Sequence, residues 1–134
     1  MYWPAVAMAA LTFVVAIRMF RLRIAQIRRE KIRLQSVATS RDMAEKLSDS
    51  RGADNFRNLF ELPVLFYLGL VIAAQTGQVN SLTLALAWLF VAARIVHSYI
   101  HCTYNRVKHR FYAFVASFFT LCAFWIVLAI GLAR

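Results

Sequence analysis

Three stretches of the chain carry no charged side chain: residues 1–17, 62–93 and 111–133. A helix needs about 20 residues to cross the roughly 30 Å hydrocarbon core of a bilayer. The first and third stretches can therefore each cross once, the first with help from arginines that reach back to the interface. The middle stretch is too long for one crossing, and its polar residues 75–81 favour a turn. The pattern predicts four membrane helices, at about 2–33, 55–76, 81–104 and 107–132.

The composition agrees with a lipid-embedded helical protein. Of the 134 residues, 61% are hydrophobic, which excludes a disordered chain and leaves few polar side chains to cover a water-exposed surface. Four Gly and two Pro favour long helices over a barrel of short strands. Cys102 and Cys122 lie in apolar runs and form no disulfide framework. We therefore expect one all-α domain over residues 1–134, an integral membrane four-helix bundle.

Basic residues predict the orientation of this bundle. Eleven of the 16 Lys and Arg residues lie between residues 18 and 57, four more lie at 94 and 106–110, and the turn at 75–81 has none. The positive-inside rule places the basic side in the cytoplasm, and hence both termini on the non-cytoplasmic side. Contact with anionic lipid headgroups accounts for most of the basic excess. A nucleic-acid partner is not expected, because the basic loop lacks a platform of stacking aromatic residues.

One face of the second predicted helix is polar and consists of Asp54, Arg57, Asn58 and Glu61, spaced i, i+3, i+4 and i+7. Glu61 borders an apolar run, where burial of an unpaired acid costs several kcal/mol, so it should face a protein interior or a polar cavity. An ion pair between Glu61 and an arginine, which would lock the bundle, is an equally good interpretation. Pro63 deprives the Leu59 carbonyl of its helical partner and can open the helix locally.

The third predicted helix carries Arg94, His97 and His101 on one stripe, and Arg106 and Arg110 follow at the start of the fourth helix. Because no carboxylate shares this stripe, we expect no metal site there. Arg18 and Arg21 bring positive charge to the same depth from the first helix. A cavity between these faces would suit a ligand with more negative than positive charge, such as a small zwitterionic peptide.

These residues resemble the motifs of a known family, the membrane-associated proteins in eicosanoid and glutathione metabolism (MAPEG). Nearly the whole chain is similar to a prokaryotic member in length and topology, and the specific likeness lies in short segments. Arg57-Asn58-Leu59-Phe60-Glu61 resembles the Arg-Asn-x-x-Glu signature of the second helix. The membrane prostaglandin E synthase branch has segments that resemble Arg94-Ile95-Val96-His97, Arg106 with Arg110, and Arg21-Leu22-Arg23.

The resemblance implies a homotrimer that binds glutathione in a bent form, between neighbouring subunits, at the cytoplasmic side of a bacterial inner membrane. It implies that Glu61 pairs with the glutathione ammonium group and that Arg110 is catalytic and stabilises the thiolate. The remaining residues of the implied glutathione site are Arg21, Arg57, Asn58, Arg94, His97, His101 and Arg106. Membrane lipids and a lipophilic small-molecule substrate are the other expected partners.

Thiolate stabilisation has a clear energetic purpose. A free thiol with a pKa near 8.5 is only about 3% ionised at pH 7, and the thiolate is the nucleophile. Lowering that pKa by about two units is worth roughly 2.7 kcal/mol and makes the anion the major form. Arg110 can contribute to this because a guanidinium keeps its charge at every relevant pH.

Four positions depart from the prostaglandin synthase branch. Asp54 stands where that branch has an arginine, His101 replaces a tyrosine, and Phe111 and Phe114 replace hydroxyl residues near the thiol. The charge reversal at Asp54 would weaken binding of one glutathione carboxylate unless Arg51 or Arg57 compensates.

Three hypotheses follow for the function. The leading one is a glutathione transferase-like membrane enzyme that transfers the thiolate to a lipophilic electrophile or reduces a lipid hydroperoxide. The second is a non-catalytic lipid-binding or scaffold protein of the same fold. The third, a small multidrug-type transporter, is disfavoured because the first helix has no acid before Arg18 to couple proton movement.

Overall fold

The computed structural model describes residues 1–47 and 49–133, and within these ranges every regular element is helical. Four segments are long and apolar enough to cross a membrane: α1, α3 together with α4, α5, and α6. The elements are α1 (Tyr2–Arg29), the 3-10 helix η1 (Leu34–Val37), α2 (Ser40–Lys46), α3 (Arg51–Asn58), α4 (Leu62–Gln75), α5 (Ser81–Cys102) and α6 (Val107–Leu132). The prediction of an all-α fold with four apolar helices is confirmed.

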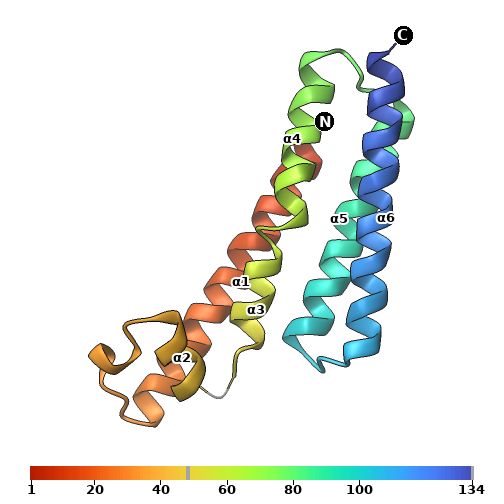
Figure 1. The fold of residues 1–134 in the computed structure, drawn as a ribbon. Coiled ribbons are helices and arrows are strands. Elements are labelled where there is room, and N and C mark those ends of the chain that lie inside the picture. The colour runs from red at the N-terminus through yellow and green to blue at the C-terminus, as the bar shows by residue number, and fades with distance from the viewer. Residues whose placement is uncertain (48, 134) are drawn as a thin grey trace.

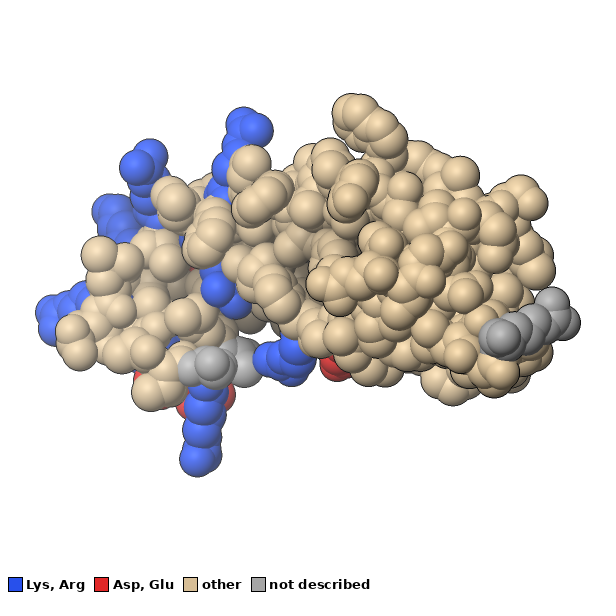
Figure 2. Space-filling model, turned by 90° about the horizontal axis from the view of Figure 1, so that it is seen from above, with Lys and Arg blue, Asp and Glu red and all other residues tan. Residues whose placement is uncertain are grey.

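The helices form one elongated bundle. Figure 1 shows α5 and α6 as an antiparallel pair that lies beside α1, α3 and α4. Both chain ends lie toward the end of the bundle that holds the α4–α5 turn, and the α5–α6 turn and the connection through η1 and α2 lie toward the other end. Figure 2 shows lysines and arginines gathered over one part of the molecule, with most of the remaining face formed by uncharged residues.

The second predicted helix is two helices in the structure. It starts at Arg51 rather than 55, stops at Asn58, and resumes at Leu62. Pro63 lies in the first turn of α4, where its missing N–H needs no helical acceptor. The Phe60 amide donates to the Arg57 carbonyl at 2.9 Å, which tightens the end of α3. The local opening at Pro63 is therefore a complete break in the helix.

The other boundaries differ by at most four residues. The first helix ends at Arg29 rather than 33, and Lys31 follows with a φ of 51°. The third helix ends at Cys102 rather than 104. The connection between α1 and α3 contains α2, which no periodic pattern predicted; its N-terminus is fixed by reciprocal hydrogen bonds between Thr39 and Asp42.

Specific residues make the turn between α4 and α5. Gly77 has a φ of 69°, a conformation that glycine adopts readily, and the next amide, that of Gln78, donates to the Ala73 carbonyl. The Asn80 side chain then accepts from two amides at the start of α5 and caps that helix. Helices α4 and α5 are thereby held antiparallel.

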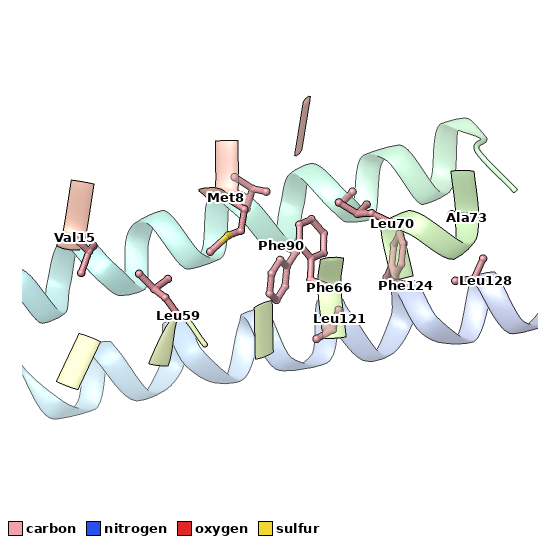
Figure 3. Packing of buried hydrophobic residues seen from close by; sticks show 12 residues of the cluster. Met8, Val15, Leu59, Phe66, Leu70, Ala73, Phe90, Leu121, Phe124 and Leu128 are labelled. Carbon is pink, nitrogen blue, oxygen red and sulfur yellow. The ribbon is translucent and has the colours of Figure 1, made fainter. Parts of the chain in front are cut away.

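Aromatic rings fill the core where α4, α5 and α6 meet (Figure 3). Phe66 stacks on Phe90 with ring centroids 4.5 Å apart, and Phe124 lies 6.3 Å from Phe66. Gly69 allows α4 to approach α6 closely, because a Cβ at this position would lie 2.6 Å from the Phe124 ring. A small residue at such a contact lets two membrane helices pack closely.

We predict that Gly69→Val destabilises the bundle by about 1–3 kcal/mol, because the added carbons would force the Phe124 ring out of its site. The measurement is thermal unfolding of the detergent-solubilised protein. Ala85→Val is the control, since Ala85 is exposed on α5. Equal melting temperatures for the two variants would contradict the assigned α4–α6 contact.

Candidate functional site

An open cavity of about 400 Å³ lies between α3, α5 and α6. This volume falls in the range of roughly 300–1,000 Å³ that is typical of small-molecule sites. The lining residues are Asp54, Arg57, Asn58, Glu61, His97, His101, Val107, Arg110, Phe111 and Phe114. The cavity therefore combines four charged side chains with an apolar wall supplied by α6.

The break between α3 and α4 places Glu61 outside regular helix, at the N-cap of α4, where its exposed side chain lines the cavity. Arg57 is also exposed, one helical turn earlier, and Asn58 lies half-buried beside it. The ion pairs found among the described residues use Glu30, Glu45 and Asp49 as their acids. Glu61 is not in a direct ion pair among these described residues, but its charge attracts the buried Arg94.

Arg94 lies behind the cavity wall and is fully buried. Its Nη2 donates a 2.9 Å hydrogen bond to the Asn58 carbonyl. In an unbroken helix that carbonyl would accept from the amide of residue 62, so Arg94 satisfies an acceptor that the break leaves free. Among the described residues, its Nε and Nη1 atoms have no hydrogen-bond partner. Arg94 thus positions the segment that carries Asn58 and Glu61, and does not itself line the cavity.

The two histidines form the α5 wall of the cavity. The rings of His97 and His101 meet edge to face with centroids 5.7 Å apart, and each residue is only 2% exposed. The Nδ1 of His97 lies 3.2 Å from the Arg110 carbonyl, so Nδ1 is the donor of this hydrogen bond. Within the described part of the chain, Nε2 of His97 and Nδ1 of His101 are buried without a partner. A polar ligand could therefore reach these two nitrogens only if the side chains that cover them moved.

Arg110 is held in place by two side chains. Its Nη1 donates to Asn105 Oδ1 at 2.9 Å and lies 3.1 Å from Nε2 of His101. Because a guanidinium only donates, Nε2 of His101 must be the acceptor, and the proton of the neutral ring lies on Nδ1. The Arg110 guanidinium is thereby fixed at the cavity wall before any ligand binds.

Asn105 was not among the residues predicted for the site. This residue has a φ of 46° in the α5–α6 turn, where asparagine tolerates the left-handed conformation better than most residues. An asparagine just after a helix, followed at i+5 by a candidate catalytic arginine, was the available signal. Asn55 was also missed: it is fully buried, accepts from Ser98 Oγ and donates to Cys102 Sγ, each at 3.3 Å, and so joins α3 to α5.

The structure brings six of the nine expected site residues to one cavity: Arg57, Asn58, Glu61, His97, His101 and Arg110. Arg94 supports this cavity from behind. Arg21 and Arg106 do not line it within one chain. Arg21 borders a separate hollow of about 630 Å³ along α1, and Arg106 is exposed at the N-cap of α6.

Other charged residues near the cavity already have partners. The Arg51 side chain donates to both Asp49 oxygens and to the Thr103 carbonyl. This hydrogen bonding to Arg51 lowers the pKa of Asp49 below its ordinary value. Arg18 donates to the Cys102 carbonyl, which ties α1 to the end of α5. Arg51 and Arg18 thus satisfy carbonyls at the helix end and hold the cavity-forming helices together.

The arrangement of cavity and helices agrees with the comparison to protein families. A model of the MAPEG family matches residues 1–130. The chain belongs to the MAPEG family. No curated protein and no solved structure matches it in the corresponding comparisons. It is accordingly an integral multi-pass membrane protein of the superfamily of glutathione and eicosanoid metabolism, whose members generally use glutathione.

In this MAPEG chain the cavity can hold a small ligand with charges of both signs. Glu61 offers an acceptor for an ammonium group, and Arg57 and Arg110 offer donors for anionic groups from two different helices. Phe111 and Phe114 extend one side of the cavity with apolar surface. The geometry thus suits a polar ligand that meets a lipophilic molecule at the same place.

We predict that two replacements of Asn105 separate its role in the turn conformation from its role as the acceptor for Arg110. Asn105→Gly keeps the positive φ but removes the acceptor for Arg110, whereas Asn105→Ala loses both. The alanine variant should be less stable than the glycine variant by about 1 kcal/mol, because a Cβ disfavours this conformation. Thermal unfolding measures this difference. Equal stability of the two variants would contradict the assigned turn geometry.

Proposed function

We propose that the protein is a glutathione-dependent membrane enzyme, a transferase or peroxidase that acts on a lipophilic electrophile. The observation that supports this most directly is the cavity in which Arg57 and Glu61 of the second span face His101 and Arg110 of the last two spans. Family membership supports the use of glutathione. The fixed guanidinium at the cavity wall supports chemistry in addition to binding.

The proposed binding mode follows from charge. Glu61 pairs with the ammonium group of the γ-glutamyl residue, and Arg57 with Asn58 binds the carboxylate beside it. The cysteine thiol then lies at Arg110. Because Asn105 and His101 hold the Arg110 guanidinium in advance, its charge is oriented toward the sulfur without reorganisation when the thiol loses its proton.

The transfer needs one thiolate and the electrophile, whereas reduction of a hydroperoxide consumes two glutathione molecules and passes through a sulfenic acid on the first. In a transfer, sulfur forms a bond to the electrophilic carbon, and the leaving group departs with the bonding electron pair. With a hydroperoxide, the thiolate attacks the terminal oxygen, the O–O bond breaks, and the lipid leaves as its alkoxide, which takes up a proton. A second glutathione then forms the disulfide and releases water.

The lipophilic substrate is proposed to enter from the bilayer. Phe111 is exposed on α6, and Phe114 lies half-buried one turn further, both at the cavity. Apolar surface of this kind gives no selectivity among lipid electrophiles beyond size and shape. Substrate that is already dissolved in the membrane reaches this wall without crossing water.

We further propose that the enzyme is a homotrimer whose basic side and cavity face the cytoplasm, with both termini on the opposite side, in a bacterial inner membrane. The concentration of basic residues between 18 and 57 supports this orientation. In this trimer Arg21, which borders a hollow apart from the cavity of its own chain, is proposed to reach the cavity of a neighbouring copy.

The first prediction from this proposal concerns Arg110. In Arg110→Ala the pKa of bound glutathione should rise toward the solution value of about 8.5, and turnover should fall by roughly 100-fold. The ultraviolet absorbance of the thiolate, followed by stopped flow at neutral pH, measures the first effect. Lys108→Ala is the control, since Lys108 is exposed on the same helix and lies outside the cavity.

Two results would change the proposal. If the wild-type protein shows neither a thiolate signal nor turnover, the enzyme hypothesis is wrong. If Arg110→Ala still binds glutathione and lipid and retains its function in cells, the non-catalytic lipid-binding or scaffold role is favoured. The transporter hypothesis receives no support from the family match.

The proposed trimer places Arg21 at the glutathione site of a neighbouring copy. Arg21→Ala should weaken glutathione binding by about tenfold, the loss expected for one charge-assisted hydrogen bond. Calorimetry on the solubilised protein measures this affinity. Arg28→Ala is the control, because Arg28 is exposed two turns further along α1. Equal affinities in the two variants would contradict a contribution of Arg21 to a neighbouring cavity.

A further inference from the structure

The cavity contains a second acid that the proposed function does not use. Asp54 lines the cavity from α3, one helical turn before Arg57, and is half-buried. Ser50 Oγ donates a 2.8 Å hydrogen bond to Asp54 Oδ2. A hydroxyl is neutral, so this contact orients the carboxylate without cancelling its charge.

No cation is paired directly with Asp54 within the described residues. Arg51, three positions earlier, is engaged by Asp49 and the Thr103 carbonyl. The other acids lie in the connection between α1 and α3, so Asp54 and Glu61 are the two carboxylates of the cavity. They share the lining with the guanidiniums of Arg57 and Arg110, and the buried Arg94 behind the wall attracts Glu61 in addition.

Ionised glutathione brings more negative than positive charge to this lining. It carries two carboxylates, a thiolate and one ammonium group, for a net charge of about −2 near neutral pH once the thiol has ionised. Its γ-glutamyl end is locally neutral, because an ammonium and a carboxylate share one carbon. The glycine carboxylate has no such companion. Beside Asp54 it would meet a like charge in surroundings that screen less than water.

We propose that Asp54 determines ligand specificity and that the cavity prefers a glutathione-type thiol whose glycine carboxylate is masked, as an amide, an ester or a cationic conjugate. This inference rests on the proposed function, because it assumes that a glutathione-type thiol occupies the cavity. Removal of one negative charge from the ligand relieves the repulsion at Asp54 and leaves the ammonium for Glu61 and the sulfur for Arg110. A cationic group at that end would in addition pair with Asp54.

The test compares two ligands on three proteins by calorimetry in detergent. The ligands are glutathione and its glycyl ethyl ester, which differ by one negative charge and an ethyl group, so the effect of charge is read from the change between wild type and Asp54→Asn. The proteins are wild type, Asp54→Asn and Glu45→Gln. Glu45→Gln changes the net charge by the same one unit, but at an exposed residue of α2 outside the cavity.

Wild type should bind the ester more tightly than glutathione, by about fivefold to tenfold. In Asp54→Asn this ratio should fall close to one, mainly through tighter binding of glutathione, whereas Glu45→Gln should keep the wild-type ratio. Equal affinity of wild type for the two ligands would overturn the inference, and so would a ratio that Asp54→Asn leaves unchanged.

The comparison of ligands on wild type can overturn the inference even if Asp54→Asn does not fold. Binding of glutathione without preference for the ester would overturn the specificity role and leave the proposed function intact. Absence of binding for both ligands would overturn the proposed function, and the role of Asp54 with it. The two failures are therefore distinguishable in a single set of titrations.

Discussion

The hydrogen bond from Arg94 to the Asn58 carbonyl is the contact on which the candidate site depends. Pro63 cannot continue the α3 helix, and a free carbonyl inside an apolar bundle is costly. Arg94 supplies a charged donor from α5 and makes the break stable. The break in turn releases Glu61 from the helix and lets it line the cavity, so a buried cation on one span fixes the acid on another.

On the cavity wall opposite Glu61, the α5–α6 turn fixes the position of Arg110. Asn105 both adopts the turn conformation and accepts from Arg110, while His101 accepts from the same guanidinium. The catalytic candidate is therefore built on the most extensively packed pair of helices in the chain. Rigid support of this kind favours a charge that acts on a developing anion without reorganisation.

The presence of both acidic and basic side chains in its lining is the other constraint on the cavity. Two acids and two arginines line it, and direct ion pairs among the described residues occur elsewhere. Unpaired charges of both signs at one cavity suit a ligand that brings its own ammonium and its own anions. Asp54 then disfavours a ligand that places an additional anion beside it. The charged residues of the cavity therefore govern both the affinity for the ligand and the selectivity among ligands.

The amino-acid sequence was sufficient to predict the four spans, because a bilayer requires apolar runs of a given length and places charges at their ends. It also located the weak point at Pro63 and the residues of the Arg57–Glu61 motif. Three features could be seen only in the folded chain: Arg94 turns inward behind the cavity, Asn105 holds Arg110, and Arg21 lies outside the cavity of its own chain. Periodicity gives the face of a helix, whereas the rotation of each helix against its neighbours depends on contacts such as Gly69 with Phe124, which are distant in sequence.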